Sequence, residues 1–429
     1  MSFVVFVFYK NFLAPLAYCL LQILRPLTSG KLREMIEDKN HRHTRLKSDR
    51  TETEIRDAQP FWIHAASGEI EYARPVIREL KKLYPEIPLL VTYSSPSAKK
   101  ILDSIHEIDA WSALPWDLSG DVKQFLARWN PRLILFSRTD VWPVLSQVCR
   151  SKQIPAILFS ATFADNSSRL KGLTRYLTRY SLNQLSSIQC VTEQDIQNLQ
   201  PLLLNTALTV TGDTRFDQVF HRLENPKPLK NLLIPRPEDF VFIAGSTWPE
   251  DEAVLLPALA RMQGSGCKVI LAPHETGAEH LAFLEKEMKR LGISYVRYSQ
   301  TETWRIDEVL LVDQVGLLAE LYTWGDIAFI GGSFRKQVHS VMEALAAGLP
   351  VLVGPCHLNN REALLYQRKN FSSGLIVQIV HTSEDVFVLV ERLKKKQGHL
   401  TQIKSEIRLE VEKNRHSTLK VIAEIQRWI

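Results

Sequence analysis

Short apolar runs alternate with stretches of helical periodicity along most of this chain, and that alternation limits the available folds more than any other feature. Such runs are typical of buried strands, and a helix between successive strands produces βαβ units. These units form a parallel sheet that helices cover on both faces. The runs fall into two series, at 61–66, 89–93, 133–136, 156–159, 188–192 and 208–211, and then at 240–244, 269–272, 309–312, 327–330, 351–353 and 375–379.

The two series, together with a length of 429 residues, predict two domains. A proline-rich stretch without helical or strand periodicity, ENPKPLKNLLIPRP at 224–237, separates the series and is typical of a linker. We therefore expect an α/β protein with two Rossmann-like, doubly wound domains, the first at 27–223 and the second at 238–429. The last helix is able to pack back on the first domain.

Residues 1–26 differ from the rest of the chain, because Phe3 to Leu24 is almost wholly apolar. At about 1.5 Å per residue a helix of this length reaches across a hydrocarbon layer of ~30 Å. Lys10 and Pro15 interrupt the run and fit equally well a helix that lies in the membrane interface. A packed apolar helix is the third alternative. Basic residues follow the run, which favours a body on the cytoplasmic side of a membrane.

The composition is that of a globular protein, with 45% hydrophobic and 23% charged residues. Lys and Arg number 53 against 47 Asp and Glu, and a net charge of +6 suits acidic ligands or an anionic membrane surface. The chain has no RNP-like aromatic motif, zinc-finger spacing or long basic run, so we expect no nucleic acid partner. Its five cysteines are scattered without CxxC pairs, which predicts reduced thiols and no metal site.

Polar residues follow several strands of the first series, where ligands bind in doubly wound sheets. In FWIHAASGEIEY, at 61–72, Ser67 and Gly68 allow a tight turn and place Glu69 in the ligand crevice. The alternative is that Glu69 only stabilises the first turn of its helix. FSRTDVWP, at 136–143, brings Arg138 and Asp140 to a second strand end, where a structural salt bridge is the other interpretation.

VTGDTRFD, at 210–217, ends the last strand of the first series and places Arg215 near the cleft that we expect between the domains. The alternative is a surface arginine that pairs with Asp213 or Asp217.

The second series has its own polar strand ends. AGSTWPEDE, at 244–252, carries Ser246 and Thr247 into an acidic helix, and Gly331-Gly332-Ser333 permits close backbone approach before a helix that we expect to begin near Val338. His339 and Glu343 are four residues apart, hence on one face of that helix, with Ser340 beside them. This arrangement suits a ribose and a phosphate, whereas the other interpretation is a partly buried histidine and an exposed acid.

These motifs, in this order and over nearly the whole chain, resemble the Kdo (3-deoxy-D-manno-octulosonic acid) transferases of lipopolysaccharide synthesis. The resemblance implies a GT-B glycosyltransferase attached to the inner membrane, with CMP-Kdo as donor, lipid A precursor (lipid IVA) as acceptor, and no metal or other cofactor. The motifs are HAASGE at 64–69, VTGDTRFD at 210–217, AGSTWPEDE at 244–252, APHE at 272–275, VDQVGLLAELYTWGDIAFIGGS at 312–333 and HSVMEALAAG at 339–348.

Residue by residue, the resemblance implies that Glu69 is the general base and that configuration inverts. Arg215 matches a lysine that stabilises the transition state, and Arg138 stands where the family motif ETELWP has its first glutamate. The donor-binding residues are those at the strand ends and those that match the CMP loop, the PRH-type loop and the NPLE segment: Ser246, Thr247, Pro273, His274, Val315, Gly316, Leu317, Gly331, Gly332, Ser333, His339, Ser340, Val341, Met342 and Glu343.

The chain departs from the family pattern at several of these positions. The usual SVGE is the shorter SGE, Asp140 replaces the second glutamate of ETELWP, Ser340 replaces an asparagine, and the PRHPER loop is reduced to APHETGAEH. Two rival functions stay open. The first is a GT-B transferase or epimerase that uses a UDP-sugar, and the second is a membrane-associated scaffold whose catalytic site has decayed, an alternative that the reversed charge at Arg138 permits.

Overall fold

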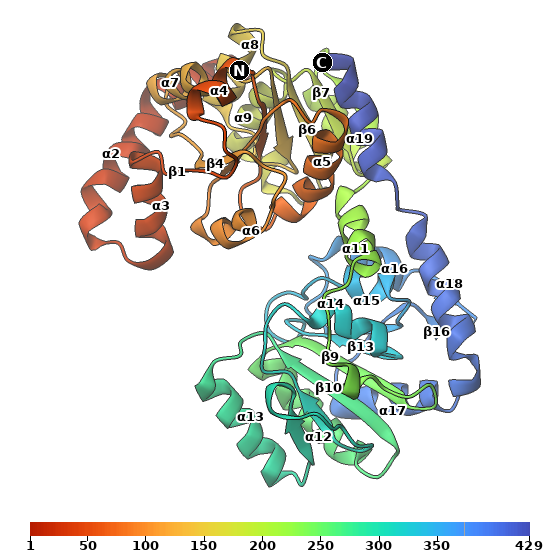
Figure 1. The fold of residues 1–429 in the computed structure, drawn as a ribbon. Coiled ribbons are helices and arrows are strands. Elements are labelled where there is room, and N and C mark those ends of the chain that lie inside the picture. The colour runs from red at the N-terminus through yellow and green to blue at the C-terminus, as the bar shows by residue number, and fades with distance from the viewer. Residues whose placement is uncertain (373) are drawn as a thin grey trace. The chain divides into compact units, whose positions relative to one another are not determined.

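The computed structural model describes residues 1–372 and 374–429, which fold as two compact units (Figure 1). Unit 1 comprises Met1–Gln218 and His416–Ile429, and unit 2 comprises Val219–Arg415. The division falls within helix α11 (Thr214–Glu224), so the proline-rich stretch at 224–237 lies inside unit 2 rather than at the division. The last helix, α19 (Ser417–Ile425), belongs to unit 1.

Among the described residues, unit 1 is built on an eight-stranded sheet in the order β1-β4-β3-β2-β5-β6-β7-β8. All neighbours pair in parallel except β1 and β4, which are antiparallel. The strands are β1 (Thr44–Leu46), β2 (Phe61–His64), β3 (Leu89–Tyr93), β4 (Ala110–Ala113), β5 (Leu133–Ser137), β6 (Ala156–Ala161), β7 (Ser187–Cys190) and β8 (Ala207–Val210). The helices are α3 (Gly30–Asn40), α4 (Glu52–Asp57), α5 (Ile70–Leu83), α6 (Lys99–Asp103), α7 (Ser119–Trp129), α8 (Pro143–Ser151), α9 (Gly172–Leu182) and α10 (Glu193–Leu199).

The core of unit 1 has two layers, because successive side chains of a strand point to opposite faces of the sheet. In β2, Trp62 packs on one face with Phe125 of α7. Phe61 and Ile63 belong to the other layer, which includes side chains of α5 and α19. Val421 of α19 is fully buried in this layer, so the C-terminal segment completes the core of unit 1.

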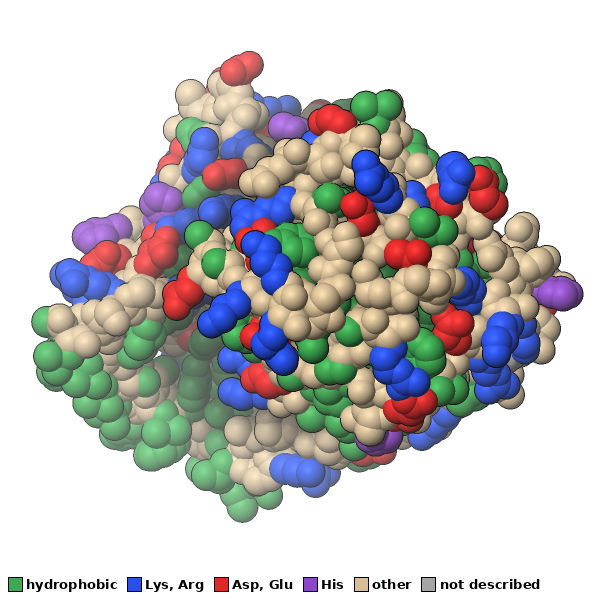
Figure 2. Space-filling model, turned by 90° about the horizontal axis from the view of Figure 1, so that it is seen from below, with side chains coloured by type: hydrophobic (Ala, Val, Ile, Leu, Met, Phe, Trp, Pro, Cys, Tyr) green, Lys and Arg blue, Asp and Glu red, His purple; other side chains and the backbone are tan. Residues whose placement is uncertain are grey.

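The N-terminal segment forms one helical rod over Ser2–Leu27, long and apolar enough to cross a membrane by length and composition. It consists of α1 (Ser2–Phe8), a π-helical turn (Tyr9–Leu13), α2 (Ala14–Leu24) and a short 3-10 turn (Arg25–Leu27). Phe6 is buried and stacks on Tyr180 of α9 at 3.8 Å between ring centroids. The outward side chains are apolar and exposed, and hydrophobic atoms gather at the left of Figure 2, on the side where α2 lies in Figure 1.

Unit 2 carries, within the described part of the chain, a seven-stranded sheet in the order β11-β12-β10-β9-β13-β14-β17, parallel throughout. The strands are β9 (Phe240–Thr247), β10 (Cys267–Pro273), β11 (Tyr295–Arg297), β12 (Val309–Leu311), β13 (Ile327–Ile330), β14 (Val351–Val353) and β17 (Val377–Ile379), with a separate hairpin of β15 (Asn370–Phe371) and β16 (Gly374–Leu375). The helices are α12 (Pro249–Met262), α13 (Ala278–Arg290), α14 (Leu318–Leu321), α15 (Met342–Ala346), α16 (Arg361–Gln367), α17 (Ser383–Lys394) and α18 (Leu400–Glu412).

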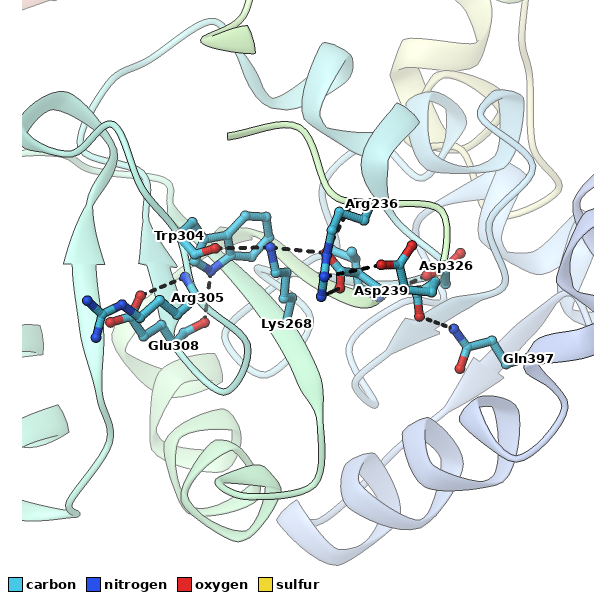
Figure 3. A network of polar contacts seen from close by, with 10 residues as sticks. Arg236, Asp239, Lys268, Trp304, Arg305, Glu308, Asp326 and Gln397 are labelled. Atoms are coloured by element: carbon cyan, nitrogen blue, oxygen red, sulfur yellow. Dashed lines mark hydrogen bonds and ion pairs between the residues drawn. The ribbon is translucent and has the colours of Figure 1, made fainter. Parts of the chain in front are cut away.

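A buried polar network joins the amino ends of the central strands of unit 2 (Figure 3). The Lys268 ammonium donates to the Asp239 carboxylate at 3.1 Å and to the Trp304 carbonyl at 3.0 Å. Asp326, just before β13, accepts from the backbone amide of Val241 at 2.8 Å. This network lies at the opposite edge of the sheet from the strand ends where ligands bind in doubly wound folds.

Candidate functional site

Unit 1 has a pocket of about 430 Å³ at the carboxyl ends of β2, β5 and β8. Its lining brings together three of the predicted residues, Glu69, Arg138 and Arg215. They come from segments far apart in sequence, but the carboxyl ends of parallel strands lie at one edge of the sheet. The remaining lining residues are Ala66, Ser67, Gly68 and Tyr72.

Glu69 lies at the N-terminus of α5 without acting as a side-chain cap. Its carboxylate turns back and accepts from the backbone amide of Ala66 at 3.2 Å, while Glu71 supplies the acid of the first helical turn. Burial raises the pKa of the Glu69 carboxyl, and the nearby negative charge of Asp140 raises it further. A carboxylate with a raised pKa holds a proton more strongly, which suits a general base.

Asp140 is held in the opposite way. It pairs with the fully buried His64 ring at 3.0 Å, through Nε2, and accepts a longer hydrogen bond from Ser94 at 3.4 Å. Burial raises the pKa of the Asp140 carboxyl, but the hydrogen bond from His64 and its charge outweigh that effect and lower the pKa to about 2. Two nearby carboxyls with pKa values driven apart are a recurrent arrangement at acid–base sites.

Arg138 sits directly after β5 with a φ of +65°, in the left-handed region that costs a side-chain-bearing residue energy. Its amide still continues the sheet, donating to the Phe159 carbonyl at 3.0 Å. The guanidinium lies 4.5 Å from the centroid of the Tyr72 ring and donates to the Tyr72 hydroxyl at 2.8 Å and to the Thr162 hydroxyl at 3.1 Å. The alternative interpretation, a salt bridge between Arg138 and Asp140, is therefore wrong, because the Asp140 carboxylate pairs with His64 instead.

Arg215 approaches the same aromatic ring, with its guanidinium carbon 5.6 Å from the Tyr72 centroid. Its backbone amide donates to the Asp213 carboxylate at 2.8 Å. Asp217, the other candidate partner, receives hydrogen bonds from the backbone amides of His416 and Thr418, both at 2.6 Å, and so fastens the C-terminal segment.

Tyr72 is the pocket residue that the sequence reasoning missed. It follows Glu69 by three residues, and the i, i+3 relationship on a helix was the available signal that both face the same side. Gly68 also differs from expectation, because its φ is ordinary and a methyl group placed on it would meet no atom within 4 Å. The turn therefore does not need glycine, and the space beside Gly68 is open.

In unit 2, the carboxyl ends of β9, β10 and β13 meet in close backbone packing. A methyl group on Gly331 would lie 2.1 Å from the Ser246 carbonyl oxygen, so Gly331 is required by the contact between two strand ends. Gly332 has a φ of +80°, and Ser246 adopts a left-handed φ of +55°. Asp251 of α12 ties the turn by accepting from the amides of Gly332 at 2.6 Å and Phe334 at 2.9 Å.

A stack of three flat side chains stands at these strand ends. The His274 ring stacks on both Trp248 and His339, at centroid distances of 4.6 and 4.4 Å. The Trp248 indole donates to Nε2 of His339 at 2.7 Å, so these two rings lie edge to edge. Burial lowers the pKa of His339 to about 4, with a further contribution from His274, so His339 is neutral at pH 7 and carries its proton on Nδ1. Arg335 covers the outer face of Trp248 at 4.1 Å.

A pocket of about 260 Å³ opens beside this stack. Of the residues that line this pocket, the sequence predicted Thr247 as a site residue and none of the others. The available signal was a tryptophan at the end of a strand, followed by an acidic start of a helix. The other lining residues are Trp248, Pro249, Glu250, Glu275, His280 and Arg335.

The expected helix from Val338 is wrong in its start and its length. The helix α15 begins at Met342 and ends at Ala346, so His339 lies in the preceding loop and does not share a helical face with Glu343. Two hydrogen bonds fix the loop: the amide of His339 donates to the Gly331 carbonyl at 3.0 Å, and the His339 carbonyl accepts from the Asn360 side chain at 3.0 Å. Pro273 ends β10 directly before His274.

Several predicted donor-binding side chains are occupied by the fold itself. Ser333 is fully buried, donates to the Ile330 carbonyl at 2.9 Å and accepts from the Gly354 amide at 2.8 Å. Val341 and Met342 are also fully buried, and the Ser340 hydroxyl accepts from the amide of Met342 at 3.3 Å. For these residues, a ligand contact would have to come from the backbone.

The loop at Val315, Gly316 and Leu317 lies at the carboxyl end of β12. Gly316 has a φ of +87°, and its carbonyl accepts from Arg222 at 3.0 Å and Lys227 at 3.3 Å. Arg222 also forms a two-pronged ion pair with the buried Glu320, at 3.0 Å for each bond. The hydrogen bonds from Arg222 and Lys227 thus fix the backbone of the loop at Gly316, while the side chain of Val315 is exposed.

Comparison with known sequences places the chain in a family. It is 30% identical over 332 residues to the 3-deoxy-D-manno-octulosonic acid transferase of Bordetella pertussis, a match that covers 71% of this chain and 73% of that protein. The chain belongs to the Kdo transferase family. The family model for the Kdo transferase N-terminal region matches residues 38–218.

Other Kdo transferases agree with this assignment. The chain is 29% identical over 301 residues to the Rickettsia felis enzyme, covering 69% of this chain, and spans 64% of the length of that relative. The Chlamydia pneumoniae enzyme is 29% identical over 329 residues, with 73% of each chain covered.

Solved structures confirm the predicted fold class. The UDP-GlcNAc 2-epimerase of Neisseria meningitidis bound to UDP-GlcNAc matches with a TM-score of 0.56 at 16% identity, covering 84% of this chain and all of that one. Anabaena Alr3699/HepE in complex with UDP matches with a TM-score of 0.56 at 12% identity, covering 86% of this chain and 100% of that chain. This member of the Kdo transferase family thus has two parallel-sheet α/β domains of the GT-B type.

Proposed function

We propose that this chain is an inverting glycosyltransferase that moves Kdo from CMP-Kdo to lipid A precursor (lipid IVA) in lipopolysaccharide synthesis. The observation that carries the proposal is the state of Glu69 in a member of the Kdo transferase family: a carboxyl with a raised pKa, in an open pocket beside two guanidinium groups. The strained backbone of Arg138 beside the partly desolvated Glu69 argues against a scaffold with a decayed site, because backbone strain of this kind clusters at functional sites.

In the proposed reaction, the Glu69 carboxylate takes the proton of an acceptor hydroxyl. That oxygen forms a bond to the anomeric carbon of Kdo while the bond from this carbon to the CMP phosphate oxygen breaks. CMP leaves with the bonding electron pair, and attack from the face opposite the leaving group inverts the configuration. Asp140 is the poorer base, because its pKa of about 2 makes it too weak to accept a proton near neutral pH.

We propose that the donor nucleotide binds at the carboxyl ends of the strands of unit 2. The neutral His339, the stacked His274 and Trp248, and the backbone around Gly332 offer flat surfaces and hydrogen-bonding groups to a base, ribose and phosphate. Glu343 follows this loop in the first turn of α15 and is proposed to bind the ribose. Glu343→Ala should weaken CMP binding roughly ten- to a hundredfold, as expected for one lost charged hydrogen bond.

The reaction is proposed to need no resident metal, with arginine side chains supplying positive charge. Incubation with EDTA followed by gel filtration should leave the transfer rate unchanged. The apolar rod at Ser2–Leu27 is proposed to hold the protein on the cytoplasmic face of the inner membrane, where a lipid acceptor is concentrated.

The decisive experiment combines product analysis with ligand discrimination. Purified protein, CMP-Kdo and lipid IVA should give a product heavier by Kdo in the mass spectrum, and calorimetry should detect CMP but not UDP or UDP-GlcNAc. Binding of UDP-GlcNAc without Kdo transfer would instead support the UDP-sugar enzyme. Binding of CMP with no transfer by the wild-type protein would favour the decayed scaffold.

A further inference from the structure

The pocket in unit 1 holds two positively charged groups against one aromatic ring. The guanidinium of Arg138 and that of Arg215 lie 4.5 and 5.6 Å from the centroid of Tyr72. Both groups border the same pocket, so an anion that enters it is attracted by two positive charges. The ring anchors both groups through cation–π contacts and fixes their orientation.

Arg138 has capacity to bind such an anion. A guanidinium carries five N–H donors, and those of Arg138 that bond within the protein go to two neutral hydroxyls, Tyr72 and Thr162. Among the described residues, no carboxylate forms an ion pair with Arg138. The Arg138 side chain is half-buried and borders a pocket of about 430 Å³. Its remaining N–H donors are therefore not all exposed to bulk solvent.

The backbone indicates that this placement is specific. Arg138 is held at a φ of +65° although β5 ends at Ser137 immediately before it, and its amide remains paired with Phe159 of β6. A strained residue that keeps its sheet hydrogen bond directs its side chain away from the path of the strand. Here that direction leads into the pocket that also contains Glu69.

We propose that Arg138, Tyr72 and Arg215 form an anion-binding subsite that selects acceptors bearing a carboxylate or a phosphate close to the hydroxyl that Glu69 deprotonates. The subsite rests on the proposed function for its role in catalysis, but its binding of an anion does not. A glutamate at the position of Arg138 would give the pocket a second acid beside Glu69 and would repel the same group. Arg138 is thus a specificity-determining residue of this chain.

The direct test measures binding to the full-length protein by calorimetry, with CMP at saturating concentration so that a phosphate site used by the nucleotide is filled. The probes are free Kdo for the carboxylate, N-acetylglucosamine 1-phosphate for the phosphate, and N-acetylglucosamine as the uncharged control. At least one anionic probe should bind, and binding should weaken roughly ten- to a hundredfold in Arg138→Gln. Which probe binds decides between the two sources of negative charge.

The matched control is Arg132→Gln. Arg132 precedes the same strand at its opposite end and donates to the carbonyls of Gln59 and Ala58, outside the pocket. This variant should bind the anionic probe as the wild type does. Tyr72→Phe, which removes only the hydroxyl that orients Arg138, provides a second variant if Arg138→Gln does not fold, and it should weaken binding severalfold.

Kinetics supply an independent readout that a structural role would not produce. With an anionic acceptor, Arg138→Gln should raise the acceptor KM while leaving the KM for CMP-Kdo near that of the wild type, and Arg138→Lys should recover part of the loss. The proposal is overturned if neither anionic probe binds the wild type, or if Arg138→Gln binds it as tightly. Because binding is measured without transfer, a protein that binds the anion but fails to transfer Kdo would contradict only the proposed function.

Discussion

At the residue scale, the surroundings of two acids shift their pKa values in opposite directions. The Glu69 carboxylate accepts a hydrogen bond from the backbone amide of Ala66, and burial together with the charge of Asp140 raises its pKa. Asp140 bonds to the buried His64 and has a pKa of about 2. Sequence position alone does not separate these two acids, since both follow strands at the same edge of the sheet.

The first prediction concerns the rate of Kdo transfer. Glu69→Gln keeps the size of the side chain but cannot accept a proton, so the rate should fall by about 10² to 10⁴. In the wild type, the rate should also fall as the pH is lowered through the pKa of Glu69, which lies above the ordinary range of a glutamate. Rate measurements across the acid range should show this limb in the wild type and its loss in the variant.

The same substitution should not unfold the protein. A carboxyl whose folded pKa is raised opposes folding when it is ionised, so its removal at neutral pH leaves the melting temperature equal or higher. Glu71→Gln is the internal control, because Glu71 lies in the first turn of α5 and outside the pocket lining, and it should transfer Kdo normally. Transfer by Glu69→Gln within about tenfold of the wild type would exclude Glu69 as the base.

A pair of glycines gives the second prediction. Gly68→Ala should leave stability unchanged or raise it by up to about 1 kcal/mol, since Gly68 has an ordinary φ and open space around it. Gly332→Ala should destabilise unit 2, because Gly332 has a φ of +80° and the added methyl would lie 2.3 Å from the Gln337 carbonyl oxygen. Thermal denaturation measures the melting temperatures of the two variants, and equal values would contradict this interpretation.

At the scale of elements, the N-terminal rod is fastened to unit 1 at its first half. The Tyr9 hydroxyl donates to the Asp117 carboxylate at 3.0 Å, and the same carboxylate accepts from the amides of Val144 and Leu145 at 3.0 and 2.9 Å, at the start of α8. Burial raises the pKa of Asp117 to about 6, although these hydrogen bonds lower it. The rod is therefore tied to the same helix, α8, that follows the Asp140 loop.

The third prediction is that Tyr9→Phe destabilises unit 1 by about 1.5 to 3 kcal/mol, the usual cost of a hydrogen bond to a charged group. The effect should be larger at pH 7 than at pH 5, because Asp117 is ionised above its pKa of about 6 and protonated below it. Tyr18→Phe is the control, since the Tyr18 ring packs on Trp116 without a hydrogen bond from its hydroxyl among the described residues. Denaturant titrations in detergent at the two pH values measure the difference.

The fourth prediction separates membrane attachment from folding. Phe8 and Phe12 stack on each other at 5.5 Å and are exposed on the outer side of the rod. Replacing both with Asp should reduce the fraction of protein that sediments with membranes in high salt, because charged side chains do not enter the apolar layer. Unit 1 should melt as in the wild type, and full retention on membranes would argue against attachment through this rod.

At the scale of the whole molecule, each unit has its candidate functional residues at the carboxyl edge of its sheet, whereas part of its stability comes from contacts elsewhere. The amino edge of unit 2 holds the buried pair of Lys268 and Asp239, which also receives a hydrogen bond from the backbone amide of Arg236 at 3.0 Å. Mutations at this edge should therefore change folding and spare ligand binding.

The fifth prediction follows from that separation. Asp239→Ala leaves the Lys268 ammonium buried without its anion and should destabilise unit 2 by about 3 to 5 kcal/mol. CMP affinity, measured below the melting transition, should stay at the wild-type value. Glu238→Ala is the matched control, because its ion pair with Arg236 is exposed and contributes at most about 1 kcal/mol. A weakened CMP affinity in Asp239→Ala would contradict the separation.

The sequence by itself determined the two series of strands, because a buried strand leaves a local, continuous apolar run. It also gathered Glu69, Arg138 and Arg215 at one sheet edge, since parallel strands share the direction of their carboxyl ends. The sequence did not predict the edge strands β1 and β11 or the short β4. They contain polar residues such as Thr, Arg and Ser, and pairing with a neighbouring strand, rather than a local apolar run, makes them strands.

Only the tertiary structure decided which residues Asp140 and Arg138 contact. It pairs Asp140 with His64, places Arg138 against Tyr72, and has a loop rather than the expected helix at Val338. It also brought α19 back into the core of unit 1, where Val421 packs with side chains of α5. The contacts of Asp140, Arg138 and α19 join residues far apart in the chain, so their energies depend on packing and burial that a local sequence pattern does not contain.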